Sequence, residues 1–258
     1  MKKKIPMLAL LGLMGLTAAA PRAAQAEDAR ISRLVTLSVG YKLWYNSWET
    51  AIPSYTNGGT HVNAITAGPV GAHIPNMSVK VWKFLVSGSV MTSNNYRFPA
   101  FKDTFIQGGT GFTTADRYYR ATRKEYDINT GFYVTPNIVA TVGYKSVEQR
   151  YQETISNVAD EETRTWYKGP TFGLAGGAGI GYGFSLYGNG ALGYMHARYS
   201  GSSSRDIANY EAMEVGLAWR WKVVSASLGY KFQYITTRGE IDAADVSRGY
   251  IMGLNLNF

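Results

Sequence analysis

The amino-acid sequence predicts an all-β protein, a ten-stranded antiparallel transmembrane β-barrel, and three observations support this fold class. Ten segments alternate apolar and polar residues with a period of two, as half-buried strands do. The connections between these segments alternate between short and long. After residue 26, no apolar run reaches the roughly 18 residues of a membrane-spanning helix, which argues against a helical membrane protein.

The first 26 residues have the features of a secretory signal peptide. Three lysines at positions 2–4 precede an apolar run over 7–16, and Ala-Gln-Ala at 24–26 offers a small-residue cleavage site. We therefore predict a signal peptide over 1–26 and a barrel domain over 27–258. Removing this leader lowers the formal net charge from +8 to +4, so we do not expect nucleic-acid binding.

The predicted strands differ in how clearly they alternate. In the first, Val35 and Leu37 lie on the opposite face from Thr36 and Ser38. The second is the weakest, because Pro69 cannot donate a ladder hydrogen bond. The sixth and seventh are rich in glycine. The ten predicted strands cover residues 34–48, 62–74, 79–96, 118–135, 138–151, 166–181, 184–199, 210–220, 223–235 and 250–258.

Short and long connections alternate along the chain. Tight turns are predicted at Pro75-Asn76, Pro136-Asn137, Tyr182-Gly183 and the region from Arg220 to Lys222. The longer, polar connections are residues 49–61, 97–117, 152–165, 200–209 and 236–246. Such asymmetry is typical of short periplasmic turns and long extracellular loops. A soluble barrel or sandwich is the alternative, but it has no reason to keep this asymmetry.

The last predicted strand has one apolar face, formed by Tyr250, Met252, Leu254, Leu256 and Phe258. It resembles the terminal strand of bacterial outer-membrane β-barrels, where an aromatic last residue belongs to the signal that the barrel-assembly machinery reads. The resemblance implies that Tyr250 and Phe258 form this assembly signal. More generally, the architecture is similar to small porin-like outer-membrane barrels of the OmpW or opacity-protein kind, without a diagnostic motif.

A short motif recurs on predicted strands that run in the same direction. Its copies are Val39-Gly40-Tyr41-Lys42, Val142-Gly143-Tyr144-Lys145 and Leu228-Gly229-Tyr230-Lys231, with the variant Leu192-Gly193-Tyr194-Met195. Alternation places each tyrosine outside and each glycine inside. We expect the missing side chain to relieve crowding where the strand curves.

Few residues in this sequence could carry catalysis. It contains no cysteine, and no two of its three histidines have a metal-ligand spacing, so we expect neither a metal site nor a cofactor. On a strand, His196 and Ser200 are roughly 13 Å apart by rise, too far for proton transfer. The omptin surface proteases are ten-stranded and use aspartates with an Asp-His pair, but no aspartate here lies within three residues of a histidine.

Several charged side chains have inward parity, and we predict two lumenal ion pairs among them. Counting around the short turns places Lys145 opposite or diagonal to Asp127, and Lys231 opposite or diagonal to Glu214. Glu125 shares the inward face of Asp127. Lys42 meets no acid on the inward face of the closing strand, so we expect it to face water or a ligand.

Three cations have outward parity near the long-loop ends: Lys168, Arg198 and Arg248. Beyond the apolar band they would face lipid phosphates, so we predict contacts with lipopolysaccharide. Ordinary solvation at the rim is the alternative. Other loop-side cations, Arg123 among them, are expected to be solvated.

The sequence therefore favours a non-enzymatic outer-membrane barrel that passes small solutes as a porin does, or that has a structural or surface role. Two alternatives stay open: a rim enzyme acting as a protease or lipid A-modifying hydrolase, and a surface adhesin that binds through its long loops. If the two ion pairs obstruct the bore, its conductance should be small and should change in a variant carrying Glu214→Gln with Asp127→Asn.

Overall fold

The computed structural model describes residues 35–56, 59–93, 95–107, 111–155, 161–203, 205–238 and 244–258. The predicted signal peptide, residues 1–26, lies outside these ranges. No helix in the described part of the chain is long and apolar enough to cross a bilayer.

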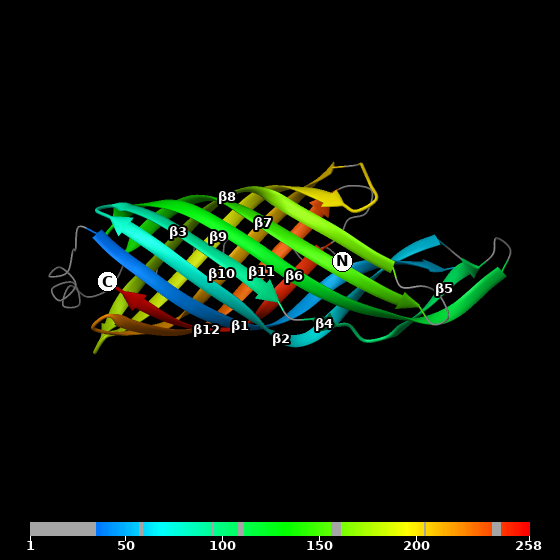
Figure 1. Ribbon diagram of the computed structural model, residues 1–258, viewed down its shortest axis with the longest axis horizontal. Coiled ribbons are helices and arrows are strands. Elements are labelled where there is room, and N and C mark those ends of the chain that lie inside the picture. Colours follow the sequence, from blue (N-terminus) through cyan, green and yellow to red (C-terminus); the bar gives the residue numbers. More distant parts are fainter. Residues whose placement is uncertain are drawn as a thin grey trace.

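The described residues form one antiparallel sheet of inclined strands (Figure 1). Its strands are β1 (Val35–Thr56), β2 (Gly59–Val81), β3 (Phe84–Ser93), β4 (Tyr96–Arg97), β5 (Phe101–Gln107), β6 (Gly111–Thr135), β7 (Ile138–Ile155), β8 (Glu161–Gly181), β9 (Phe184–Tyr199), β10 (Arg205–Trp221), β11 (Val224–Arg238) and β12 (Ala244–Asn257). Because β3, β4 and β5 follow one another along β6, they occupy one position in the sheet.

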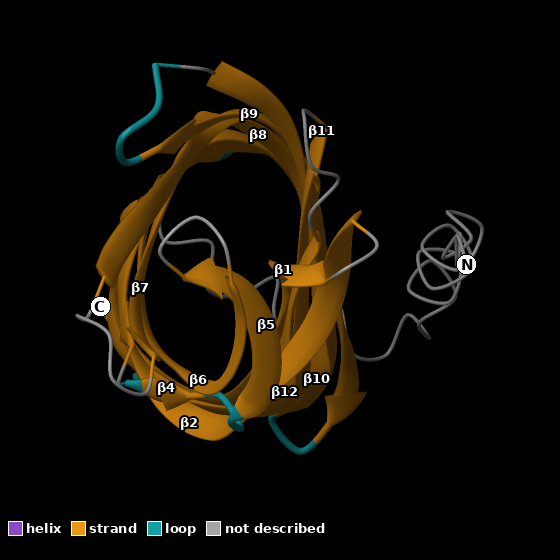
Figure 2. Ribbon diagram, turned by 90° about the vertical axis from the view of Figure 1, so that its right-hand side faces the viewer, coloured by secondary structure: helices purple, strands orange, loops and turns teal. Residues whose placement is uncertain are grey.

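The sheet closes into a ten-stranded barrel. Its order runs β3-β2-β1-β12-β11-β10-β9-β8-β7-β6, and pairing of β3 with β6 completes the ring. Figure 2 shows this ring from the long-loop end. The predicted all-β, ten-stranded antiparallel barrel is confirmed.

The two ends of the barrel differ as the sequence predicts. Two-residue turns at 82–83, 136–137, 182–183 and 222–223 join strands at one end. Phe258 lies at this same end, where its backbone N–H donates to Leu37 and its carbonyl accepts from Leu37, at 2.8 and 3.1 Å. At the other end the strands run further than expected, since β1 and β2 stay paired as far as Thr56 and Gly59.

The predicted turn at Pro75-Asn76 is wrong. Strand β2 continues through both residues to Val81, and the chain turns at Trp82-Lys83. The pairing of β2 with β3 skips Pro75, passing from Asn76–Ser89 to His73–Thr92, so its missing N–H interrupts no paired step with β3. Trp82 adopts a left-handed backbone conformation, with φ of 52°. Glycine and asparagine are the residues that usually indicate this conformation in a sequence, and tryptophan is not.

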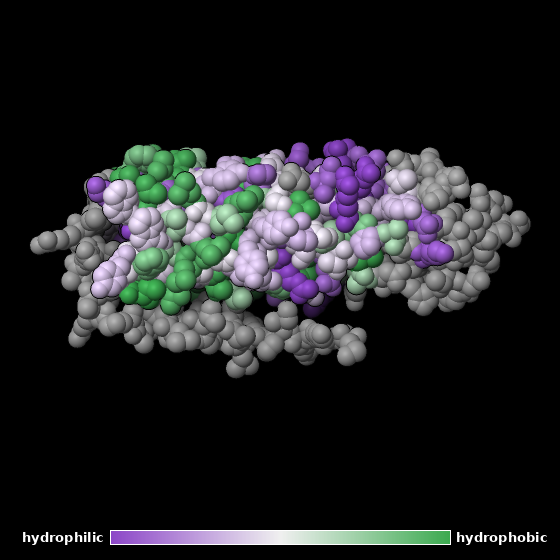
Figure 3. Space-filling model, turned by 90° about the horizontal axis from the view of Figure 1, so that it is seen from below, coloured by the Kyte–Doolittle hydropathy of each residue, from purple (hydrophilic) through white to green (hydrophobic). Residues whose placement is uncertain are grey.

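On the side of the barrel seen in Figure 3, apolar side chains cover the outer surface near the short turns, and hydrophilic ones gather toward the long-loop end. Ile128, Val134, Phe172 and Leu254 each leave more than half of their surface exposed on this outer face. Such a belt suits contact with lipid tails.

The inward glycines of the recurring motif leave no room for a side chain. A Cβ at Gly143 would lie 2.5 Å from the Ile128 carbonyl oxygen, and one at Gly229 would lie 2.5 Å from that of Val215. At Gly193 the nearest atom would be a Thr171 methyl carbon at 3.0 Å. The expectation that glycine relieves crowding on the inner face is confirmed.

Gly229→Ala should lower the free energy of unfolding by about 1–3 kcal/mol, because the neighbouring backbone must shift to accept the methyl group. Gly88→Ala is the matched control, since its Cβ would lie 3.6 Å from the Asp127 carbonyl oxygen, in ordinary contact. Urea titration of the refolded protein in detergent, followed by tryptophan fluorescence, measures both. Equal midpoints for the two variants would contradict the crowding argument.

Candidate functional site

The inner face of the barrel changes character along its axis. Near the short turns it carries small or polar residues such as Ser38, Thr141, Gly173 and Asn189, which are partly accessible. Further toward the long-loop end, inward side chains are buried. Seven of them, each at most 1% exposed, form what we call the sealing layer: Trp44, Trp48, Arg123, Glu125, Lys145, Gln149 and Gln233.

The carboxylate of Glu125 lies at the centre of the sealing layer. One of its oxygens is 2.7 Å from an Arg123 nitrogen, and the other is 2.6 Å from Lys145 Nζ. The side-chain amide of Gln233 donates to Glu125 at 3.1 Å and to the Tyr210 hydroxyl at the same distance. Two buried cations and a buried amide therefore depend on one carboxylate.

Several of these contacts cross the lumen. Arg123 on β6 donates to Gln233 on β11 at 3.0 Å and to Ser247 on β12 at 2.6 Å. Since β6 and β11 are five positions apart in a ring of ten, they lie on opposite walls. Gln149 on β7 reaches Asp245 on β12, also five positions away, at 3.2 Å.

Asp245 is the acceptor of a second polar group nearer the long-loop end. It accepts hydrogen bonds from the Trp48 indole, the Gln149 amide and the Tyr167 hydroxyl, each at 3.2 Å. Tyr151 extends this group, because its hydroxyl donates to the side-chain oxygen of Gln149 at 3.1 Å.

The predicted pair of Asp127 and Lys145 is present in the structure. The two residues are directly opposite in the β6–β7 register, and Lys145 Nζ is 2.8 Å from the carboxylate. Glu125, predicted to face the lumen, does so and binds the same lysine.

The predicted pair of Glu214 and Lys231 is correct in register but wrong in partner. The two residues are opposite on β10 and β11, yet Glu214 binds Lys42 at 2.8 Å, and Lys231 Nζ lies 4.7 Å from the centre of the Trp44 ring. Lys42, expected to face water or a ligand, is 27% exposed, but it also has an acidic partner that the sequence did not predict. Its side chain passes over Gly253, where no side chain obstructs it, and so reaches beyond the neighbouring strand.

The sequence reasoning missed Arg123 as a lumenal residue. It has the inward parity of Glu125, two positions along β6, so alternation was the signal that could have placed it. Because Arg123 is charged and lies near a long loop, we expected water to solvate it. Gln149 and Asp245 were missed because a neutral amide and a carboxylate near a loop carry no distinctive pattern.

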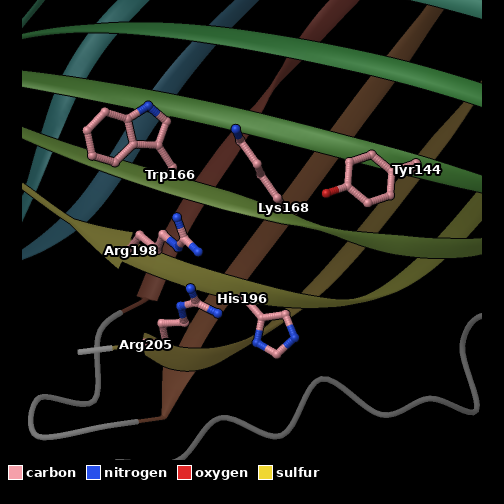
Figure 4. Close-up of a pocket in the computed structure, with 6 residues that line it drawn as sticks. All are labelled: Tyr144, Trp166, Lys168, His196, Arg198 and Arg205. Carbon is pink, nitrogen blue, oxygen red and sulfur yellow. The ribbon is translucent and has the colours of Figure 1, made fainter. Parts of the chain in front are cut away.

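The three predicted rim cations do not lie together. Lys168 and Arg198 line one outward-facing pocket of about 460 Å³ with Tyr144, Trp166, His196 and Arg205 (Figure 4). Arg248 lies on β12, where its guanidinium is 3.9 Å from the Glu49 carboxylate. Tyr250 is outward and packs edge-to-face on Tyr230, with ring centres 5.6 Å apart, and Phe258 is half exposed.

Neither histidine whose side chain is described faces the lumen. His73 hydrogen-bonds the Tyr41 hydroxyl on the outer face, and His196 packs against Tyr194 at the outer pocket. The described residues contain no group of three or more His, Cys, Asp or Glu side chains placed to hold a metal ion.

Comparison with known proteins shows the fold. No protein-family model and no curated protein matches the chain. The crystal structure of the outer-membrane protease OmpT from Escherichia coli is similar over 86% of this chain and 97% of that one, with 12% identity and a TM-score of 0.59. The β domain of the Bordetella autotransporter BrkA matches over 87% and 100%, with 11% identity and a TM-score of 0.44. The likeness to OmpT shows that the chain has the fold of a bacterial outer-membrane β-barrel, and at 12% identity it shows the fold alone.

Proposed function

We propose that this protein is a non-enzymatic outer-membrane barrel with a closed lumen, and that its role is structural or at the cell surface. The sealing layer is the observation that carries this proposal. In the proposed orientation the short turns lie in the periplasm, the apolar belt lies in the bilayer and the long-loop end lies outside. The predicted signal peptide would direct export, and the assembly machinery and outer-membrane lipids would be partners.

Porin-like passage is the less favoured function, because the hydrogen bonds that cross the lumen would have to break. A barrel of about eight strands is filled by its own side chains, and ten strands add little width. Opening the bore would break the hydrogen bonds that join Arg123 and Glu125 to Gln233 and Ser247 on the opposite wall. A buried charged group that loses its hydrogen-bond partners is costly. Solutes therefore have no ready path through the closed form.

A surface-binding role is favoured over a rim enzyme by the long-loop end. There the barrel continues past the belt around a buried aromatic cluster that includes Trp48, Tyr96, Phe98 and Tyr119. Trp48 packs edge-on against Tyr96, with ring centres 5.1 Å apart. This packing supports the strand ends from which the long loops extend. The two histidines whose side chains are described, His73 and His196, lie on the outer wall of the barrel.

Planar-bilayer recording tests the closed lumen. The wild-type protein, refolded and inserted from detergent, should show no stable conductance steps over a range of voltages. Heat-modifiable mobility on a gel would verify that the inserted sample is folded. Regular, long-lived steps from the folded wild type would contradict the proposal and restore a porin-like function.

A further inference from the structure

The outward pocket of about 460 Å³ gathers positive charge on the outer wall. Strands β7 to β10 each contribute to it, and Figure 4 shows Arg198 and Arg205 lying next to each other with Lys168 and His196 nearby. Lys168 is opposite His196 in the β8–β9 register, and Arg198 is opposite Arg205 in the β9–β10 register. Its size falls within the range of about 300–1,000 Å³ typical of small-molecule sites.

Two arginines directly opposite each other repel, so such a pair needs an anion. The same barrel shows how this need is met elsewhere. Arg150 and Arg164 are also opposite in register, on β7 and β8, and Glu162 lies 3.6 Å from the first and 2.7 Å from the second. The Glu162 carboxylate compensates that pair.

The Arg198–Arg205 pair has no such carboxylate among the described residues. Neither arginine, nor Lys168, forms an ion pair within the described ranges. Glu148, on the same outer face, is opposite Trp166 on β8 and Lys124 on β6, so it does not lie opposite either arginine. An anion from outside the chain would therefore take the place that Glu162 takes in the other pair.

The position of the pocket indicates which kind of anion. On the short-turn side of it, the same outer face carries exposed Phe172, Leu192 and Tyr194, which belong to the apolar belt. A ligand that fills the pocket would therefore have its anionic part among the cations and its apolar part along the belt. A free phosphate would contact only the cations and would leave the apolar belt without a partner.

We propose that this pocket binds the phosphorylated headgroup of lipopolysaccharide, with Arg198 and Arg205 as the principal phosphate ligands and Lys168 beside them. Guanidinium groups suit phosphate because they donate two hydrogen bonds in a fixed geometry. The choice of lipopolysaccharide rests on the proposed orientation, in which the pocket faces the outer leaflet. Arg248 is not part of the site, since Glu49 is its neighbour.

Calorimetric titration of the refolded full-length barrel in neutral detergent tests the proposal. The probes are lipid A with its phosphates, dephosphorylated lipid A, phosphatidylglycerol and inorganic phosphate. We expect phosphorylated lipid A to bind most tightly. Arg198→Gln with Arg205→Gln should weaken that binding by on the order of tenfold or more, because charge-assisted hydrogen bonds are lost.

Arg150→Gln with Arg164→Gln is the matched control, and its affinity for lipid A should stay within about twofold of wild type, since Glu162 already compensates that pair. Unchanged binding in the Arg198 and Arg205 variant would overturn the proposal, as would equal binding of dephosphorylated lipid A. Equal binding of phosphatidylglycerol, or binding of inorganic phosphate alone, would overturn the choice of ligand. The titration does not depend on the lumen, so its failure and a conducting lumen are separate results.

Discussion

Glu125→Gln should lower the free energy of unfolding by about 3–5 kcal/mol, the usual cost of removing one partner from a buried ion pair. The carboxylate is 1% exposed and lies 2.7 Å from Arg123 and 2.6 Å from Lys145. Lys145 keeps Asp127 as a second partner at 2.8 Å. Arg123 keeps no carboxylate within ion-pair distance among the described residues, so the substitution leaves its charge buried and uncompensated.

Glu162→Gln is the control for this effect. It makes the same chemical change in a carboxylate that also lies between two cations, Arg150 and Arg164, but all three side chains are 39–44% exposed. Water already solvates these charges, so the cost should be at most about 1 kcal/mol. Urea unfolding in detergent gives both values, and similar small losses for the two variants would show that the lumenal charges are hydrated.

Alternation along single strands predicts which residues face the lumen, because a strand's side chains change face at every step. It also predicts the Asp127–Lys145 pair, since β6 and β7 are joined by a two-residue turn that sets their register. The Lys42–Glu214 pair lies beyond such reasoning. It joins β1 to β10, three positions apart, and depends on the missing side chain at Gly253, beside which the Lys42 side chain passes.

The misplaced turn has a similar cause. Pro75-Asn76 has the residue types of a turn, whereas Trp82-Lys83, where the chain reverses, has none of them. Strand β2 passes straight through Pro75 because pairing with β1 is continuous there, and Tyr41 lies opposite the proline. Pairing with the neighbouring strand outweighs a local preference, and a single sequence does not show that pairing.

Removing side chains of the sealing layer should open the lumen. A variant with Trp48→Ala, Arg123→Ala and Glu125→Ala is expected to show discrete conductance steps where the wild type shows none. The three side chains are at most 1% exposed, and the Arg123 guanidinium lies 5.8 Å from the centre of the Trp48 ring. Their loss removes the contacts from Arg123 to the opposite wall and the bulk beside them.

The three substitutions leave Lys145 and Gln233 with partners. One positive and one negative group disappear together, and Lys145 keeps Asp127, while Gln233 keeps the Tyr210 hydroxyl. Replacing both members of a buried ion pair costs less than stranding one of them, so the variant should still refold. Its unfolding free energy should therefore fall by less than the sum of the losses in the separate variants.

A control variant with Trp219→Ala, Arg164→Ala and Glu162→Ala makes the same chemical changes on the outer face, where all three side chains are exposed. It should insert and stay closed like the wild type. Steps in the lumenal variant alone would identify the sealing layer as the barrier to solutes. If the lumenal variant also stayed closed while folded, the aromatic cluster at the long-loop end, around Tyr96 and Tyr119, would be the barrier instead.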